Sequence, residues 1–307
     1  MTRIVADVDT GIDDACALTF LACSPQVDLV ACSTVSGNTT AELAAHNTAA
    51  VLQACGNEGL RRGGPDAALA RTAIPVVIGR PVPLQVPLAT TPETHGPTGL
   101  GHAEVAPAPY PPEVRDFLEI WRDAVAAGPA TLLLTGPLTN LAVAIEQAPD
   151  VVDRFDQIVI MGGAHGHPGN TTERAEWNTW CDPDAAARVH SHFAGSDRLP
   201  VVCGLDITET IILSPERLSA LALALGSPAP RLVPGEHRQY TAGPPVLDLL
   251  VNALSFYFQF HLDEGSGYLA HVHDLLAAVI AAGVVDVDTE AYAVQVGLGE
   301  AERAPLT

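Results

Sequence analysis

Short apolar segments rich in Val, Ile and Leu alternate along the chain with longer stretches whose apolar residues recur at helical spacing. The segments typical of strands are Arg3–Val8, Leu29–Val35, Pro75–Ile78, Thr131–Thr135, Gln157–Met161, Pro200–Leu205 and Ala291–Val296. The stretches typical of helices are Asp13–Cys23, Ala41–Cys55, Pro112–Ala127, Leu138–Ala148, Pro183–His192, Pro215–Leu225, Val246–Leu262 and His273–Ala282. Such alternation builds right-handed crossover units. It therefore predicts an α/β fold with an open, mostly parallel central sheet flanked by helices.

The 307 residues show no internal repeat and no break in composition, so we expect a single domain spanning residues 1–307. Two connecting segments are unusually long. Residues 80–112 contain nine prolines and a Gly-rich string, and residues 162–181 contain several polar side chains after a predicted strand. Loops of this length are usually functional or disordered. For the first segment, a flexible Pro-rich insert remains an alternative to a functional loop.

Four aspartates, Asp7, Asp9, Asp13 and Asp14, lie within eight positions at the first strand-to-helix turn. Ligands of open α/β sheets bind at the carboxyl ends of strands. Carboxylates so close together raise one another's pKa unless a cation neutralises them, and a set of oxygen ligands favours Ca²⁺ or Mg²⁺. The alternative is an acidic turn in which Asp13 caps the following helix. Asp7 and Asp9 lie on the strand side of the turn, however, where they would not cap a helix. The sequence therefore predicts a divalent-cation site.

Polar residues also follow other predicted strands, and parallel strands bring their carboxyl ends to one edge of the sheet. These groups are Ser36-Gly37-Asn38, Thr135 to Asn140, and Asn170, Glu176 and Asn178. Asp274, at the start of the last predicted helix, is a further oxygen ligand candidate. For the adjacent His273, a catalytic role and a packed or solvated role both remain open.

Composition excludes several classes of function. The net charge of −21 argues against a nucleic-acid partner and against docking on an anionic membrane. All 15 basic residues are Arg, which removes mechanisms that need a Schiff-base, P-loop or kinase lysine. The six cysteines form no Cys-x-x-Cys pair and are predicted to be reduced, buried packing residues. With carboxylates where a signal peptide needs apolar residues, and no apolar run that could span a bilayer, we expect a cytoplasmic protein.

At these motifs the chain resembles the nucleoside hydrolases of the inosine-uridine preferring type. Residues 7–15 follow the family signature D-x-D-x-G-x-D-D-A. Further blocks match in family order over nearly the whole chain, namely residues 34–38, 95–101, 135–140, 161–163, 175–178, 182–186 and 273–274. The resemblance implies a Rossmann-like fold and hydrolysis of the N-glycosidic bond of ribonucleosides to free base and ribose. It also implies a small-molecule ribonucleoside as substrate and a homo-oligomer, either a dimer or a tetramer.

The family pattern further implies a Ca²⁺ ion held by Asp9, Asp14, the Thr135 main-chain carbonyl and Asp274, with Asp7 as support behind the metal site. Asp9 would also be the general base that takes a proton from the Ca²⁺-bound water, and His273 would face the nucleobase and could protonate it. The resemblance implies a set of substrate-binding residues, to which we add His95 from the Gly-rich loop. The full set is Asp13, Asn38, His95, Asn170, Glu176, Asn178 and Asp274. Either His261 or Tyr268 would help cover the base.

Three positions depart from the family pattern. Thr10 and Leu275 stand where the family usually has Pro, and both lie outside the proposed chemistry. The chain ends at Gly299–Thr307, where family members usually continue through another strand and a terminal helix, so we expect a shortened C-terminal end. His273 before Asp274 resembles the family branch with broad or pyrimidine-leaning specificity, which leaves the preferred base open.

Other classes fit the residues less well. The string Asp7 to Thr10 resembles the nucleophile motif of haloacid dehalogenase-type phosphatases, but that family expects a later lysine. An EF-hand loop needs Gly at its sixth position and Glu at its twelfth, where this chain has Ile12 and Leu18. A family member acting on another ribosyl compound, or a non-catalytic ribonucleoside-binding protein, remains the serious alternative.

Overall fold

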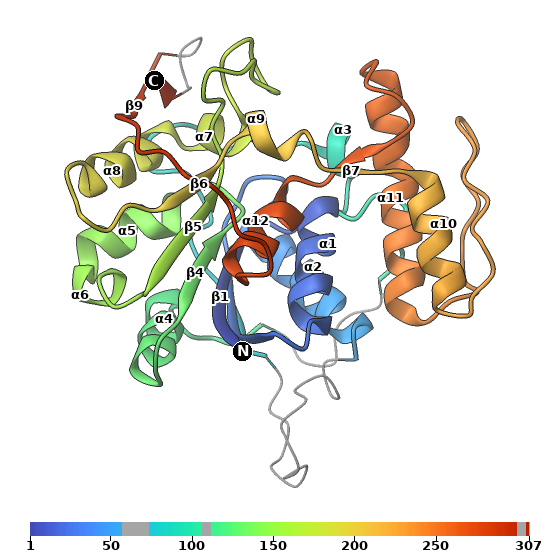
Figure 1. Ribbon diagram of the computed structural model, residues 1–307, viewed down its shortest axis with the longest axis horizontal. Helices are drawn as coiled ribbons and strands as arrows, with labels where there is room; N and C mark the ends of the chain where they lie inside the picture. The colour runs from blue at the N-terminus through green and yellow to red at the C-terminus, as the bar shows by residue number, and fades with distance from the viewer. Residues whose placement is uncertain (57–73, 106–111, 300–304, 307) are drawn as a thin grey trace, which may run out of the picture.

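The computed structural model describes residues 1–56, 74–105, 112–299 and 305–306. Its centre is a six-stranded sheet in the order β3-β2-β1-β4-β5-β6, and all neighbouring strands are parallel (Figure 1). The strands are β1 (Thr2–Val8), β2 (Val27–Thr34), β3 (Val76–Ile78), β4 (Thr131–Leu134), β5 (Gln157–Met161) and β6 (Val201–Cys203). The predicted parallel α/β fold is confirmed. The strand order reverses between β1 and β4, and ligands of such sheets bind beside that point.

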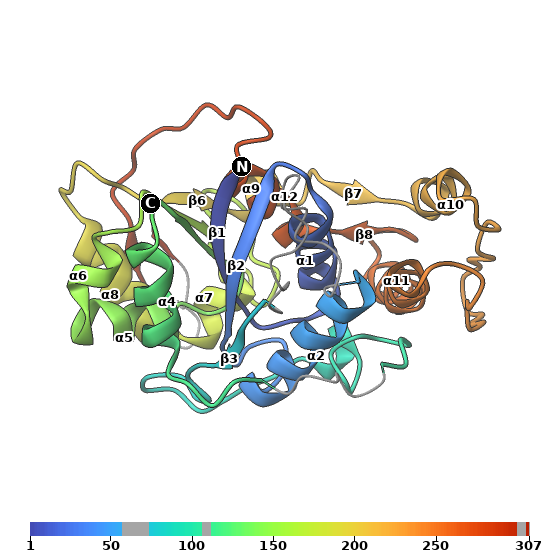
Figure 2. The same cartoon turned by 90° about the horizontal axis from the view of Figure 1, so that it is seen from below.

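Helices cover both faces of the sheet (Figure 2). On one face are α1 (Ile12–Cys23), α2 (Ala41–Ala54), α11 (Pro245–Asp263) and α12 (His273–Ala281), and on the other are α4 (Phe117–Ala126), α5 (Thr139–Gln147), α6 (Pro149–Val152) and α8 (Pro183–Phe193). The remaining helices are α3 (Pro92–His95), α7 (Trp177–Cys181), α9 (Leu205–Thr208) and α10 (Pro215–Ala224). The short helices α3, α7 and α9 lie around one end of the sheet, opposite the N-terminus of β1 (Figure 1).

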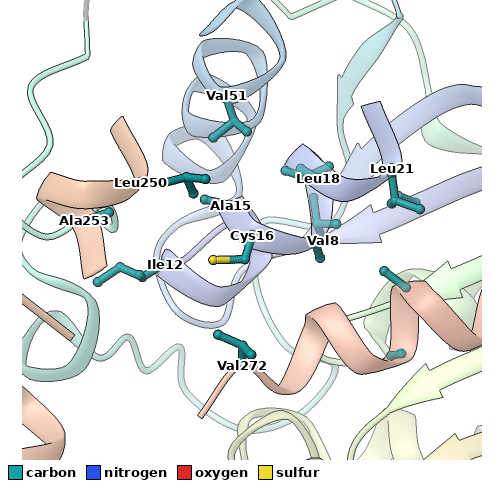
Figure 3. Close-up of a cluster of buried hydrophobic side chains, with 14 of the residues drawn as sticks. Val8, Ile12, Ala15, Cys16, Leu18, Leu21, Val51, Leu250, Ala253 and Val272 are labelled. Atoms are coloured by element: carbon teal, nitrogen blue, oxygen red, sulfur yellow. The ribbon is translucent and has the colours of Figure 1, made fainter. Parts of the chain in front are cut away.

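Helix α1 is held by apolar packing on several sides. Figure 3 shows Ile12, Ala15 and Leu18 among side chains from α2 and α11 and from the residue before α12. All three residues are 0% exposed, so substantial apolar area leaves water when this helix docks. Because the aspartates predicted as cation ligands lie in the first turn of α1, this packing fixes where they stand.

Two predicted elements differ from the observed ones. The predicted strand Ala291–Val296 is wrong as a sheet strand: only β9 (Gln295–Val296) forms, and it pairs antiparallel with β10 (Pro305–Leu306) outside the central sheet. The predicted helix Pro112–Ala127 begins at Phe117, because the Asp116 side chain accepts a 2.8 Å hydrogen bond from the Leu118 N–H and caps the helix there.

A small antiparallel pair, β7 (Ile212–Leu213) with β8 (Ala270–His271), was not predicted. Five of the six cysteines are buried as expected, but Cys23 at the end of α1 is exposed. In the part of the chain that the structure describes, no helix is long and apolar enough to cross a membrane. Most of the expected shortened end at Gly299–Thr307, namely residues 300–304 and 307, and residues 106–111 of the Pro-rich segment lie outside the described residues.

Candidate active site

A cavity of about 530 Å³ opens at the carboxyl ends of the parallel strands. This volume falls in the range of small-molecule sites in proteins. Its walls come from the segments after β1, β2, β4 and β5, from α3 and α11, and from the start of α12. The cavity is lined by Asp13, Asn38, Thr91, Glu93, Thr94, His95, Thr135, Met161, Gly169, Asn170, Thr171, Glu176, Trp177, Asn178, Glu209, Tyr257, Phe260, His261, Glu264, Ser266, His271, His273 and Asp274.

The aspartates predicted from the sequence lie together at the bottom of this cavity, in two levels. Asp13 and Asp274 line the cavity directly, and they are only 5% and 2% exposed. Asp7, Asp9 and Asp14 are 0% exposed and lie below the cavity lining. The described residues form no salt bridge with these carboxyl groups. So many enclosed carboxyl groups are costly unless they are protonated or bind a cation.

Asp7 is hydrogen-bonded to one neighbouring strand and to one helix. Its Oδ1 accepts hydrogen bonds from Ser33 Oγ at 2.5 Å and from Asn140 Nδ2 at 2.8 Å, whereas Oδ2 has no partner among the described residues. Burial raises the pKa of this carboxyl to about 7, although the two hydrogen bonds act in the opposite direction. These contacts join Asp7 to β2 and to α5.

Asp9 keeps one oxygen without a protein partner. Its Oδ2 accepts a 2.7 Å hydrogen bond from the Asn38 N–H, and Oδ1 is buried with no partner among the described residues. Burial, and then the charge of Asp14, hold the pKa of Asp9 well above its usual range. A side chain at Gly37 would place a Cβ atom 2.1 Å from Asp9 Oδ2, so only glycine allows the backbone to approach this closely.

Asp14 is positioned by three donors. Oδ2 accepts from the Gly11 N–H at 2.8 Å and from Asn38 Nδ2 at 3.2 Å, and Oδ1 accepts from Thr135 Oγ1 at 2.7 Å. The bond from Gly11 also caps the first turn of α1. One hydrogen-bond network therefore joins the ends of β1, β2 and β4 at this carboxylate.

The residues present fit a hard cation. One oxygen each from Asp13, Asp14 and Asp274 lies within 4.8 Å of the other two, which is the closest grouping of possible ligands that the described residues contain. Burial, and then the charge of Asp14, raise the pKa of Asp13 to about 7, and burial holds the pKa of Asp274 well above its usual range. The orphaned Asp9 Oδ1 and a donor set made only of oxygen suit Ca²⁺ or Mg²⁺.

This close grouping overlaps the expected ligand set only in part. It includes Asp14 and Asp274 and adds Asp13, whereas Asp9 is outside it. The Thr135 main-chain carbonyl, a further expected ligand, accepts a 2.7 Å hydrogen bond from Asn178 Nδ2.

The expected sugar-binding residues line the cavity beside the aspartates. Glu176 also caps α7: Oε1 accepts from the Asn178 N–H at 2.7 Å, and Oε2 accepts from the N–H groups of Thr179 at 2.9 Å and Gly163 at 3.0 Å. Burial raises the pKa of Glu176 despite these donors. Asn170 is exposed at the cavity edge, where its Oδ1 accepts from the Trp177 N–H at 2.9 Å.

Imidazoles form another wall of the cavity. His95, His261 and His273 are each less than 10% exposed, and burial is the main cause that lowers their pKa values to about 3, 4 and 3. At neutral pH these rings are therefore uncharged. Of the two candidates for covering a base, His261 borders the cavity, whereas Tyr268 is absent from its described lining and packs on Phe258 at 5.4 Å between ring centroids.

Sequence reasoning missed two residues of this wall, Tyr257 and His271. Tyr257 stands one helical turn before His261, and its ring lies 4.4 Å from the His261 ring. His271 stands two positions before His273 on extended backbone. The spacings of four and two residues could have identified both, since they place side chains on one face of a helix and of a strand.

Comparisons with known proteins point to one family. Residues 4–304 match the family described as inosine-uridine preferring nucleoside hydrolase. The chain is 37% identical over 221 residues to the non-specific ribonucleoside hydrolase RihC of Escherichia coli and 34% identical over 221 residues to that of Klebsiella pneumoniae. Each match covers 71% of this chain but only 66% of the relative's length.

Solved structures share the fold. The chain is similar to the plant nucleoside hydrolase PpNRh1, with a TM-score of 0.79 and 27% identity over 99% of this chain and 86% of that one. It is also similar in fold to a purine-preferring ribonucleoside hydrolase from Gardnerella vaginalis, with a TM-score of 0.79 and 24% identity over 99% of this chain and 87% of that one.

Proposed function

Because the chain belongs to the inosine-uridine preferring nucleoside hydrolase family, we propose that it hydrolyses the N-glycosidic bond of ribonucleosides to free base and ribose. The observation that carries the proposal is the set of buried carboxylates at the bottom of a cavity of about 530 Å³. Breaking an N-glycosidic bond develops positive charge on the ribosyl group, and fixed negative groups stabilise that charge.

We assign Ca²⁺ as the cofactor, with Asp9, Asp14, the Thr135 main-chain carbonyl and Asp274 as its ligands and Asp7 as support. When bound, Ca²⁺ keeps the crowded carboxylates ionised and makes the attacking water more acidic. The raised pKa values of Asp9 and Asp274 and the unpaired Asp9 Oδ1 support this assignment, because a bound cation would lower those pKa values and give that oxygen a partner.

Asp9 is the proposed general base. The Asn38 N–H occupies one lone pair of Oδ2. If Oδ1 contacts the cation, the second lone pair of Oδ2 is the one that can take a proton from the attacking water. The charges of Asp13 and Asp14 make proton uptake by Asp9 more favourable.

Sugar recognition is assigned to the polar residues on the same side of the cavity. Asp13, Glu176 and Asp274 offer acceptors for ribose hydroxyls, and the remaining contacts are assigned to Asn38, Asn170 and Asn178. A site built to bond two adjacent hydroxyls discriminates strongly against a 2′-deoxy analogue, because the buried partner would stay unpaired.

The leaving base is assigned to the imidazole wall. His273 Nδ1 lies 2.9 Å from Thr208 Oγ1, which fixes the ring and leaves Nε2 for the base. Because burial holds the ring neutral, His273 would act through its N–H at neutral pH. His95 and His261 complete the contacts to the base.

The charge of the cavity favours nucleosides over nucleotides. Six of the described lining residues are Asp or Glu and none is Arg, in a chain that contains no Lys. A phosphate group would meet negative charge without the Arg fork that usually binds it. We further propose that the protein is a single domain, as its uniform composition indicates, and that it acts in the cytoplasm. The family resemblance implies that it forms a homo-oligomer.

Release of free base and ribose from a panel of ribonucleosides tests the proposal. The panel includes uridine, cytidine and inosine, is run on cation-free protein with and without added Ca²⁺, and uses 2′-deoxyuridine as the control. We expect Ca²⁺-dependent cleavage of ribonucleosides and none of the deoxy control. If folded, Ca²⁺-loaded protein binds ribonucleosides but cleaves none of them, a non-catalytic binding protein replaces this proposal. If it neither binds nor cleaves them, the proposal is replaced by one in which the protein acts on a different ribosyl compound.

A further inference from the structure

One side chain of the imidazole wall, that of His271, has no hydrogen-bond partner among the described residues. His95 Nδ1 accepts from the Ile12 N–H at 3.0 Å, and His261 Nδ1 lies 2.9 Å from the Tyr257 carbonyl oxygen. His273 Nδ1 is bonded to the Thr208 hydroxyl. In contrast, the His271 ring makes no hydrogen bond to the described residues, although its Nδ1 is buried. Buried polar atoms in proteins are nearly always bonded, so this exception needs an explanation.

The backbone turns His271 toward the cavity. β8 pairs antiparallel with β7, with His271 opposite Ile212, so its side chains alternate between two sides. Ala270 and Val272 are 0% and 1% exposed and belong to the apolar core. His271 and His273 take the other side and line the cavity. The placement therefore follows from strand geometry.

The ring stands between two residues assigned to the base. Its centroid lies 5.1 Å from that of His261 and 6.0 Å from that of His273. The neutral ring carries its proton on either Nδ1 or Nε2. On the buried Nδ1 the proton would have no acceptor, so the tautomer with the proton on Nε2 is favoured, and only the Nδ1 lone pair is then enclosed. Nε2, the ring nitrogen farther from the backbone, is then a donor for a molecule in the cavity.

We propose that His271 is a specificity-determining residue that donates a hydrogen bond from Nε2 to an acceptor, a carbonyl oxygen or ring nitrogen, on the leaving base. This inference rests on the proposed nucleoside hydrolysis and extends it. A leaving group without a carbonyl oxygen or ring nitrogen, such as p-nitrophenol with its weakly accepting nitro group, gains much less from His271.

The test compares His271→Phe, which keeps a ring but removes both nitrogens, with His271→Gln, which keeps an N–H donor near the Nε2 position. Substrates are uridine, inosine and p-nitrophenyl riboside, whose leaving group has neither acceptor. We expect His271→Phe to lower kcat/KM for the two nucleosides by about 10-fold, mainly through KM. We expect p-nitrophenyl riboside to change less than about twofold, and His271→Gln to recover most of the loss. Inhibition by free uracil should weaken in parallel with the nucleoside KM.

His192→Phe, an exposed histidine of α8 outside the cavity, is the matched control and should leave all rates unchanged. Equal losses on nucleosides and p-nitrophenyl riboside, or no loss on any substrate, overturn the assignment of His271 while the proposed function stands. If wild-type protein cleaves no ribonucleoside, the proposed function fails and the assignment fails with it.

Discussion

At the residue scale, Asp9 combines a proposed catalytic role with an environment that disfavours its charged form. Replacing it with Asn keeps an acceptor for the Asn38 N–H and removes one buried charge. We expect Asp9→Asn to lower kcat for ribonucleosides by about 10³-fold, because the base that takes the water's proton is gone. In cation-free protein at neutral pH, the same change should keep or raise the melting temperature, since burial disfavours the charged carboxylate.

Thermal melting and single-turnover assays check both parts. Asp150→Asn, at an exposed position of α6, is the control and should change neither quantity. Near wild-type turnover by Asp9→Asn would contradict the assignment of the base.

A second prediction at this scale concerns His273, the proposed contact to the leaving base. Removing its ring should slow the departure of a base that needs a proton or a hydrogen bond. We expect His273→Ala to lower kcat for inosine by about 10²-fold and to affect p-nitrophenyl riboside far less, because nitrophenolate leaves without a proton. Parallel rate measurements on the two substrates decide the point, and equal losses would argue against a role at the leaving group.

The sequence indicated the acidic half of the site better than the imidazole half. Asp7 to Asp14 form a local string after an obvious strand, so strand geometry alone placed them at the edge of the sheet. His271 and Tyr257 come from elements whose position depends on tertiary packing. β8 is only two residues long and exists through its pairing with β7, which no local pattern predicts.

At the element scale, a buried carboxylate caps α8 and connects it to neighbouring segments. Asp182 is 0% exposed and caps α8 through the Ala185 N–H at 3.0 Å. The same side chain also accepts from Thr139 Oγ1 at 2.6 Å and from the Leu84 N–H at 2.9 Å. One carboxylate thus joins α8 to α5 and to the segment after β3.

Asp182→Ala should lower the free energy of unfolding by about 2–4 kcal/mol, because it removes a helix cap and leaves buried donors unpaired. Denaturant unfolding measures this loss. Asp184→Ala, in the first turn of the same helix, is the control and should cost less than about 0.5 kcal/mol. Since Asp182 does not line the cavity, kcat at a permissive temperature should remain near wild type.

Element boundaries show where local pattern stops being informative. The strands of the central sheet were predictable because they are continuous apolar runs, as fully enclosed parallel strands are. The segment at Ala291–Val296 has the same residue types, yet most of it is exposed and it finds no place in that sheet. β-type residues favour a strand only when a neighbouring strand is available to pair with.

At the scale of the whole molecule, stability should depend on pH and on the cation together. Asp7 and Asp13 have pKa values of about 7 in the cation-free fold against ordinary values of 3.8. Between these values the folded state binds more protons than the unfolded state, so this contribution to stability falls as pH rises from 4 to 7. His95 and His261, with pKa values lowered to about 3 and 4, act in the opposite direction, and their contribution is lost as pH falls below 6.5.

Added Ca²⁺ competes with protons for the carboxylates but not for the histidines. We therefore expect the rise in melting temperature on adding Ca²⁺ to cation-free protein to be roughly 5 °C larger at pH 7 than at pH 5. Calorimetry at the two pH values, with and without Ca²⁺, measures the difference. An equal rise at both would show that protons and the cation do not share these sites.

The two levels of carboxylates below the cavity have a kinetic consequence. Asp9 and Asp14 are fully enclosed, and lining residues separate them from the cavity: Asn38 bonds to both, and Thr135 bonds to Asp14. An ion that reaches the deeper pair therefore passes through the space that the substrate later fills. If the proposed ion binds there, we expect an ordered assembly in which the ion binds first and leaves slowly while substrate fills the cavity. Protein diluted into a chelator during turnover would lose its ion more slowly than resting protein, so saturating substrate would protect the enzyme's own cofactor.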